Sequence, residues 1–155
     1  MRSVEMDKTS QLKEFLKDLF PSQRLAVLAT QSERQPYGNL VAFVATDDLR
    51  HLLFATTRAT RKYANISGNP RIAMVVDNRS NQEADFHRAA AVTATGVVEE
   101  AGGSEKEPLL RLYLSGHPYL KEFVSSPTCA LLKMSVETYY VVRQFQHVVE
   151  LHMRE

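Results

Sequence analysis

The feature that most constrains the fold is a series of short β-type runs separated by turn residues. Such runs lie at residues 24–30, 39–46 and 51–56. Between them stand Pro36-Tyr37-Gly38 and Asp47-Asp48, which are residue types that supply the backbone dihedrals of tight turns. This order predicts three antiparallel strands joined by hairpins.

Further β-type runs follow later in the chain, at residues 71–76, 88–99, 129–136 and 139–145, the last with a possible continuation to Leu151. Gly96 stands inside the second of these runs. A glycine within a strand indicates a bulge or a close approach of another backbone. We therefore expect six or seven strands in total.

Three short helices are predicted between the strands. Residues 10–20 carry apolar side chains at helical spacing, and Pro21 is expected to stop that helix. Residues 57–67 form the second helix, closed by Gly68. Ser104 and Glu107 have the spacing of a capping box that opens the third. A β meander with helices in its crossovers favours a mainly β, antiparallel barrel over a parallel α/β sheet, and 155 residues suit one domain, 1–155.

Composition narrows the function classes. The chain has 19 basic and 18 acidic residues, so its formal charge of +1 gives no support for nucleic acid binding. Its single cysteine, Cys129, rules out a disulfide or a cysteine zinc site within one chain and suits a reducing cytoplasm. No apolar stretch approaches the roughly twenty residues of a membrane span, so we expect a cytoplasmic protein with no membrane partner.

The segment from Thr57 to Lys62 carries the most chemical information. Arg58, Arg61 and Lys62 place three cations within five residues, at the predicted start of a helix. A helix N-terminus already carries partial positive charge and free N–H donors, so cations there are unfavourable without an anion. A phosphate would resolve this conflict. The alternative is a solvated basic turn with no ligand.

The chain resembles the pyridoxamine 5′-phosphate oxidase-like, FMN-binding split-barrel superfamily. Thr60-Arg61-Lys62 opening a helix and Asn69-Pro70-Arg71 opening the next strand carry the resemblance, together with the order of elements over residues 22–100. The remainder of the chain is similar only in outline. The resemblance implies a split β-barrel, FMN as cofactor and a homodimer with flavins between the subunits.

The resemblance also implies site residues. Arg61 and Lys62 would bind the FMN phosphate, helped by Thr57 or Thr60, while Ala55 and Thr56 would lie beside the flavin. The second strand would face the ring system, and its residues are Asn39, Leu40, Val41 and Ala42. Neither a catalytic side chain nor a metal-ligand set is expected, because flavin carries out the electron transfer itself.

Several departures separate this chain from the oxidase proper. That enzyme has an arginine near the position of Asn39 and a glutamine where this chain has Ala89-Ala90-Ala91. It also ends in a tryptophan and an Arg-x-His signature, whereas this chain has no tryptophan and ends Glu150-Leu151-His152-Met153-Arg154-Glu155. We therefore expect a short, divergent relative that does not oxidise pyridoxine phosphate.

The working hypothesis is an FMN-dependent oxidoreductase whose substrate the sequence does not identify. Two alternatives stay open: a deazaflavin-dependent reductase on the same fold, and a flavin- or haem-binding carrier or sensor without turnover. His147 and His152 are candidate haem or metal ligands, although their spacing of five gives thin support. Tyr139, Tyr140 and Phe145 lie on a late strand that could reach a partner subunit, and His117 in a helix break favours a turn role over a ligand contact.

Overall fold

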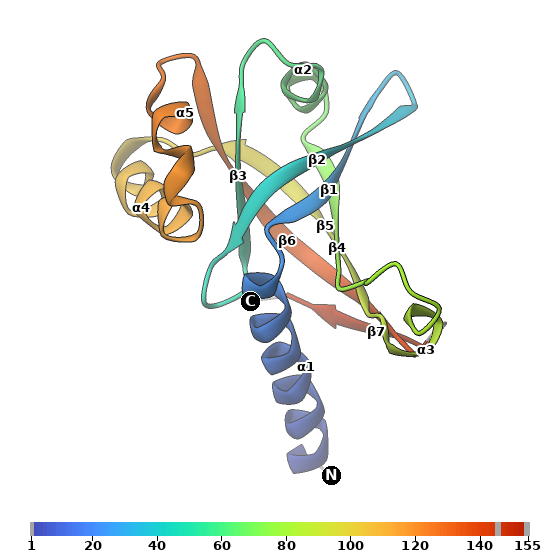
Figure 1. The fold of residues 1–155 in the computed structure, drawn as a ribbon. Helices are drawn as coiled ribbons and strands as arrows, with labels where there is room; N and C mark the ends of the chain where they lie inside the picture. The colour runs from blue at the N-terminus through green and yellow to red at the C-terminus, as the bar shows by residue number, and fades with distance from the viewer. Residues whose placement is uncertain (1, 145–146, 154–155) are drawn as a thin grey trace.

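The computed structural model describes residues 2–144 and 147–153, with side chains from residue 8 onward. Its centre is a seven-stranded antiparallel sheet (Figure 1). The strands are β1 (Leu25–Ser32), β2 (Gln35–Ala45), β3 (His51–Thr57), β4 (Arg71–Asp77), β5 (Ala91–Glu100), β6 (Cys129–Arg143) and β7 (His147–His152). Their order is β3-β2-β1-β4-β5-β6-β7, and a β3–β6 pairing closes the first six into a barrel. The predicted mainly β, antiparallel barrel is confirmed.

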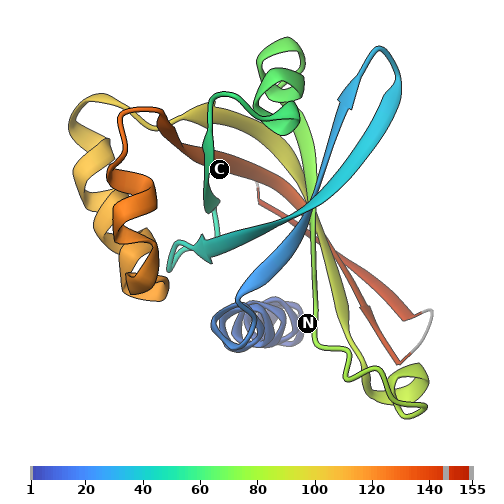
Figure 2. The ribbon, with the colours of Figure 1, turned by 45° about the horizontal axis from the view of Figure 1, so that its top comes forward.

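The barrel is split between β2 and β3. These strands pair at only three positions, from Phe43 opposite Phe54 to Ala45 opposite Leu52. Beyond them β2 and β3 diverge, while β3 stays paired with β6 along its whole length. The separation is visible in Figure 2, where β2 crosses away from β3. One edge of each strand is therefore left without a strand partner.

Helix α1 (Arg2–Ser22) adds its apolar stripe to the barrel core. Leu12, Leu16 and Phe20 are buried against Phe43 and other core residues. The helix is longer than the predicted 10–20, and Pro21 lies within its last turn instead of stopping it. Proline is tolerated there because the helix ends one residue later, where the Ser22 hydroxyl donates to the carbonyl of Leu19. No helix in the described part of the chain is long and apolar enough to cross a membrane.

A second apolar cluster lies on the outside of the barrel. Helix α4 (Lys106–Gly116), the 3-10 turn η2 (Pro118–Leu120) and α5 (Lys121–Ser125) cover β3 and β6 there. Tyr113 packs with Leu53, Ala55 and Leu131. Because β3 is covered on both faces, all its residues from Leu52 to Thr56 are buried.

Three local predictions were wrong. The capping box of Ser104 and Glu107 does not form: η1 (Gly103–Glu105) leads into α4 and no side chain caps it. Gly103 adopts a φ of +62°, and Glu105 instead pairs with Lys133 at 2.9 Å. The strand predicted over residues 88–99 starts only at Ala91, because α3 (Asp85–Arg88) precedes it. The Asp85 carboxylate accepts hydrogen bonds from the amides of Ser80 and Asn81.

The third correction concerns β6, which is one strand over Cys129–Arg143 and not two. A register shift at Thr95/Gly96 of β5 accommodates the extra residue, so that Gly96 pairs with Val136 and Thr95 with Thr138. Phe145 lies outside the described residues.

Gly96 is required at that bulge because a backbone lies against it, as its place in the sequence predicted. A Cβ built on Gly96 would stand 2.0 Å from the carbonyl oxygen of Ser135 and 3.1 Å from the Cα of Val136. Both neighbours are backbone atoms of the paired strand, so neither can rotate away.

We therefore predict that Gly96→Ala lowers the free energy of unfolding by about 1–3 kcal/mol, the cost typical of overpacking. Gly102→Ala is the matched control, since nothing lies within 4 Å of a Cβ at that position. Urea unfolding of both variants measures the difference. Equal stability of the two variants would contradict the close approach.

Candidate cofactor site

The candidate site begins where β3 ends and α2 (Arg61–Gly68) starts. Thr60 is the N-cap: its backbone is extended and its hydroxyl oxygen accepts from the amide of Tyr63 at 3.3 Å. The same hydroxyl donates to the carbonyl of Thr57 and lies 2.8 Å from that of Thr56. The helix therefore starts at Arg61, four residues later than predicted, because Thr60 ends the turn by capping.

The three cations of this segment have different surroundings. Arg58 forms an ion pair with Glu100 at 2.8 Å and donates to the carbonyl of Pro127 at 2.9 Å. Glu100 also accepts from the hydroxyl of Tyr63. Arg61 and Lys62, by contrast, have no ion pair and no side-chain hydrogen bond with any described residue. The positive charge at the helix start is therefore neutralised at Arg58 and stays without a counter-charge among the described residues at Arg61 and Lys62.

Nothing acidic compensates Arg61 and Lys62 within α2, since the first turn of the helix holds no Asp or Glu. The first-turn amides of a helix lack intrahelical acceptors, and Thr60 satisfies only that of Tyr63. Two cations and free N–H donors at one helix start form an environment that favours an anion. Arg61 is exposed and Lys62 half-buried, so both are open to a ligand from solution.

The split of the barrel lies beside this helix start. Tyr113 of α4 bridges the split. Its hydroxyl donates to the carbonyl of Ala42 on β2 at 3.1 Å, and the Tyr113 hydroxyl oxygen accepts from the amide of Ala55 on β3. Burial raises the pKa of the Tyr113 phenol, and the nearby Cys129 thiol adds to the rise. The phenol stays protonated and holds the two strands at a fixed separation.

The four predicted residues of β2 lie on two faces. Leu40 and Ala42 point outward, and Leu40 is 61% exposed. Val41 belongs to the barrel core, so its side chain is not available to a ligand. Asn39 shares the inward face of β2 and pairs with Leu28 of β1. Its Oδ1 atom is buried and has no hydrogen-bond partner among the described residues, whereas its Nδ2 donates weakly to the carbonyl of Leu40 at 3.4 Å.

The predicted residues of β3 and the turn after it are closer together. Thr57, Thr60, Arg61 and Lys62 form one continuous segment at the start of α2. Thr56 is buried and acts on this segment through its hydrogen bond to Thr60. The side chain of Ala55 lies under α4. Only backbone atoms of Ala55 therefore face the split.

Sequence reasoning missed Tyr113, Glu100 and His117 as parts of this region. Tyr113 was expected to be a core residue, which it is, but its hydrogen bond reaches a carbonyl 71 positions earlier in the chain. His117 was assigned a turn role, which it has at the end of α4, and its Nε2 also lies 2.8 Å from the carbonyl of Phe43. No local pattern reports such distant contacts.

The other residues singled out in the sequence do not assemble into a second chemical centre. His147 and His152 stand at opposite ends of β7, and the ring of His152 contacts Thr138 and Glu150. Within the described ranges, no group of three or more His, Cys, Asp or Glu side chains could hold a metal. Burial raises the pKa of Cys129, so that it remains a thiol. Tyr139 is a core residue whose hydroxyl donates to the carbonyl of Leu49.

Comparison with known proteins assigns the chain to a family. The sequence model of the pyridoxamine 5′-phosphate oxidase family matches residues 12–143, and the chain belongs to that family. No curated protein matches the sequence.

Solved structures with the same fold have low sequence identity. One is a haem-binding protein from Mycobacterium smegmatis, with a TM-score of 0.77, 17% identity and 86% of this chain covered, although the match spans only 55% of that protein. Another is general stress protein 26 from Bacillus anthracis, with a TM-score of 0.69, 21% identity and coverage of 92% and 98% of the two chains. A third is an FAD-binding protein from Mesorhizobium loti, with a TM-score of 0.63, 19% identity and coverage of 81% and 88%. At these identities the likeness shows the fold alone.

The bridge across the split gives a prediction. Tyr113→Phe removes the hydroxyl that serves Ala42 and Ala55, so we expect the free energy of unfolding to fall by about 1–3 kcal/mol, the cost of leaving buried backbone groups unsatisfied. Tyr37→Phe is the control, because Tyr37 is exposed on β2. Chemical denaturation measures both, and unchanged stability of Tyr113→Phe would show that the hydroxyl bridges nothing.

Proposed function

We propose that this protein is an FMN-binding flavoprotein and an oxidoreductase, with the flavin phosphate held at the start of α2. The observation that carries the proposal is the pair Arg61 and Lys62. Neither side chain forms an ion pair with a described carboxylate, and both lie in the first turn of α2, where backbone N–H groups lack acceptors. A phosphate monoester carries nearly two negative charges at neutral pH and three acceptor oxygens. Its charge and its acceptors match what this helix start lacks.

The remainder of the site fits the rest of such a ligand. The orphaned Oδ1 of Asn39 can accept a hydrogen bond from a ligand N–H group, and the exposed Leu40 offers an apolar surface for a ring system. Asn39 and Leu40 would thus meet different parts of the ligand from the two faces of β2. Val41 and Ala42 would contribute backbone only, because Val41 is a core residue and Ala42 packs against the cluster under α4. Bound FMN would supply the electron-transfer chemistry, while this chain binds and orients the cofactor.

The solved structures with this fold include both an FAD-binding and a haem-binding protein, so flavin and haem are the two cofactor classes to compare. Two findings disfavour haem at the histidines considered in the sequence. His147 and His152 are separated by the length of β7, and the two ring nitrogens of His117 contact Phe43 and Tyr119. A deazaflavin cofactor would meet the same cations through its own phosphate. The absorbance spectrum of the purified protein separates flavin, deazaflavin and haem.

The proposal includes a homodimer. The outer face of the sheet across β1, β4 and β5 is made of small, half-buried side chains, among them Val27, Ala29, Ala73, Val75 and Thr93. Within the described chain, the helices that pack on the barrel do so mainly against β1, β2, β3 and β6. The outer face of β4 and β5 is thus free to meet the same face of a second copy.

Replacing both Arg61 and Lys62 with alanine tests the phosphate assignment. We expect the Kd for FMN to rise by about 100-fold or more, because two charge-assisted contacts contribute at least 3 kcal/mol together. The affinity for riboflavin, which lacks the phosphate, should not change. Isothermal titration with both ligands measures this, and Arg111→Ala with Lys121→Ala on α4 and α5 is the control for a loss of two surface charges. Equal weakening of FMN and riboflavin would reject the assignment.

A charged side chain at the centre of the outer face tests the dimer. Ala73→Arg should convert a dimer into a monomer, because an arginine on β4 would be buried without a partner in the interface. Glu122→Arg on the exposed side of α5 should leave the assembly unchanged. Light scattering after size exclusion gives the mass directly. A monomeric wild-type protein, or a dimeric Ala73→Arg variant, would contradict this part of the proposal.

A further inference from the structure

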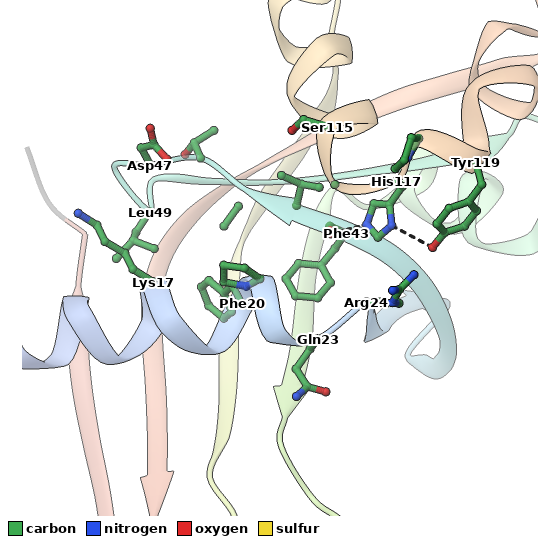
Figure 3. Close-up of a pocket in the computed structure, with 16 residues that line it drawn as sticks. Lys17, Phe20, Gln23, Arg24, Phe43, Asp47, Leu49, Ser115, His117 and Tyr119 are labelled. Carbon is green, nitrogen blue, oxygen red and sulfur yellow. Dashed lines mark hydrogen bonds between the residues drawn. The ribbon is translucent and has the colours of Figure 1, made fainter.

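One cavity of the described chain lies away from the helix start that carries Arg61 and Lys62. It has a volume of about 680 Å³, within the range of small-molecule sites, and lies between the end of α1, the last residues of β2 with the turn after them, and the end of α4 with η2 (Figure 3). None of the residues expected to bind the flavin lines it. The cavity therefore needs an explanation of its own.

The floor of the cavity is aromatic and rigid. Phe20 of α1 and Phe43 of β2 meet edge to face, with ring centroids 5.8 Å apart and an interplanar angle of 86°. Both are buried, as is Leu49 beside them, so their rings are held by the barrel core. Such a floor offers a rigid apolar contact to a ring or a branched alkyl group.

His117 and Tyr119 form one end of the cavity. His117 is only 2% exposed, and its Nε2 lies 2.8 Å from the carbonyl of Phe43, which can only accept. Nε2 therefore carries the proton, and Nδ1 is the acceptor for the hydroxyl of Tyr119 at 3.3 Å. Tyr119 itself is 62% exposed, which leaves an aromatic ring at the rim with one face free.

The charges of the cavity are unpaired. Lys17, Arg24 and Asp47 line it, and none has an ion pair with another residue in the described part of the chain. Figure 3 shows Lys17 beside Asp47 at one end and Arg24 at the other, on the side of His117 and Tyr119. The formal charges of Lys17 and Asp47 sum to zero, so the net positive charge of the lining is that of Arg24. A guanidinium presents paired N–H donors that match a carboxylate.

We propose that this cavity binds a small carboxylic acid with an aromatic or branched apolar body. The carboxylate pairs with Arg24 at the rim, and the apolar body lies on Phe20 and Phe43 with Tyr119 against its edge. His117 is a positioning residue: with both ring nitrogens engaged, it holds Tyr119 and the Phe43 carbonyl in place. The proposal goes beyond the flavin assignment and stands without it, since the two sets of lining residues do not overlap.

The probe for this site is 2-naphthoate, with neutral 2-naphthamide as its matched counterpart. The chain has no tryptophan, so the anisotropy of naphthalene fluorescence is free of indole background. We expect saturable binding of 2-naphthoate and at least tenfold weaker binding of 2-naphthamide. Absence of saturable binding, or equal binding of the two probes, would overturn the proposal.

Two sets of variants assign the site. Arg24→Gln should weaken 2-naphthoate at least tenfold and leave 2-naphthamide unchanged, whereas Arg111→Gln, an exposed cation on α4, should change neither. Tyr119→Ala should weaken both probes, because it removes the rim ring that both would contact. Binding of 2-naphthoate that is unaffected by Arg24→Gln would place the probe elsewhere and overturn the assignment.

The last comparison separates this proposal from the flavin assignment. The Arg61→Ala, Lys62→Ala double variant should bind 2-naphthoate as the wild type does, and titration calorimetry should give the same affinity with and without saturating FMN within about threefold. A protein that binds no FMN but still binds 2-naphthoate through Arg24 would refute the proposed cofactor alone. Loss of naphthoate binding in the double variant would refute the independence of this cavity.

Discussion

The separation of β2 from β3 after three paired positions is the constraint on which the rest of the structure depends. A closed barrel would bury every strand edge in a hydrogen-bonded ladder, leaving no backbone for a ligand or a helix to contact. Here Tyr113 of α4 hydrogen-bonds the carbonyl of Ala42, on the edge that β2 no longer shares with β3. His117, directly after α4, contacts the carbonyl of Phe43, a residue that still pairs with β3. The edge that β3 gives up leads directly to the N-terminus of α2. The split therefore sets the position of the cation pair relative to the strand that is expected to face the flavin.

The charge distribution around α2 follows from this arrangement. Glu100 at the end of β5 reaches Arg58 and Tyr63, so the outer side of the turn is neutral. Arg61 and Lys62 receive no such partner in the described chain. A fold that neutralises one cation of a cluster and leaves two beside free amides at a helix N-terminus concentrates positive charge there, although the net charge of the chain is only +1.

Local patterns in the sequence were sufficient for the first five strands and for the presence of α2, but not for its capped start at Thr60. The β-type runs and turn residues predicted the barrel, and Gly96 predicted a close backbone approach, which is the one to Ser135. The cation cluster after β3 predicted an anion site, and that stays a prediction. Local patterns failed where the structure of a segment depends on a contact with a residue far away in the sequence. Ser104 and Glu107 have the spacing of a capping box, but α4 starts after the 3-10 turn η1, and the residue before its first turn, Glu105, pairs with Lys133 of β6. The bridging hydroxyl of Tyr113 and the cavity at Arg24 depend on residues brought together from α1, β2 and α4, and no spacing within one segment encodes them.

The central claim is that Arg61 and Lys62 bind a doubly charged phosphate, and the ³¹P resonance of FMN added to the protein reports on this directly. Free phosphate monoesters take up a proton near pH 6. Bound between two cations and the amides of α2, the phosphate should remain a dianion, with a ³¹P shift that stays constant from pH 7.5 to pH 5. A ³¹P shift that titrates as it does for free FMN would show that the phosphate is in solvent and would contradict the account.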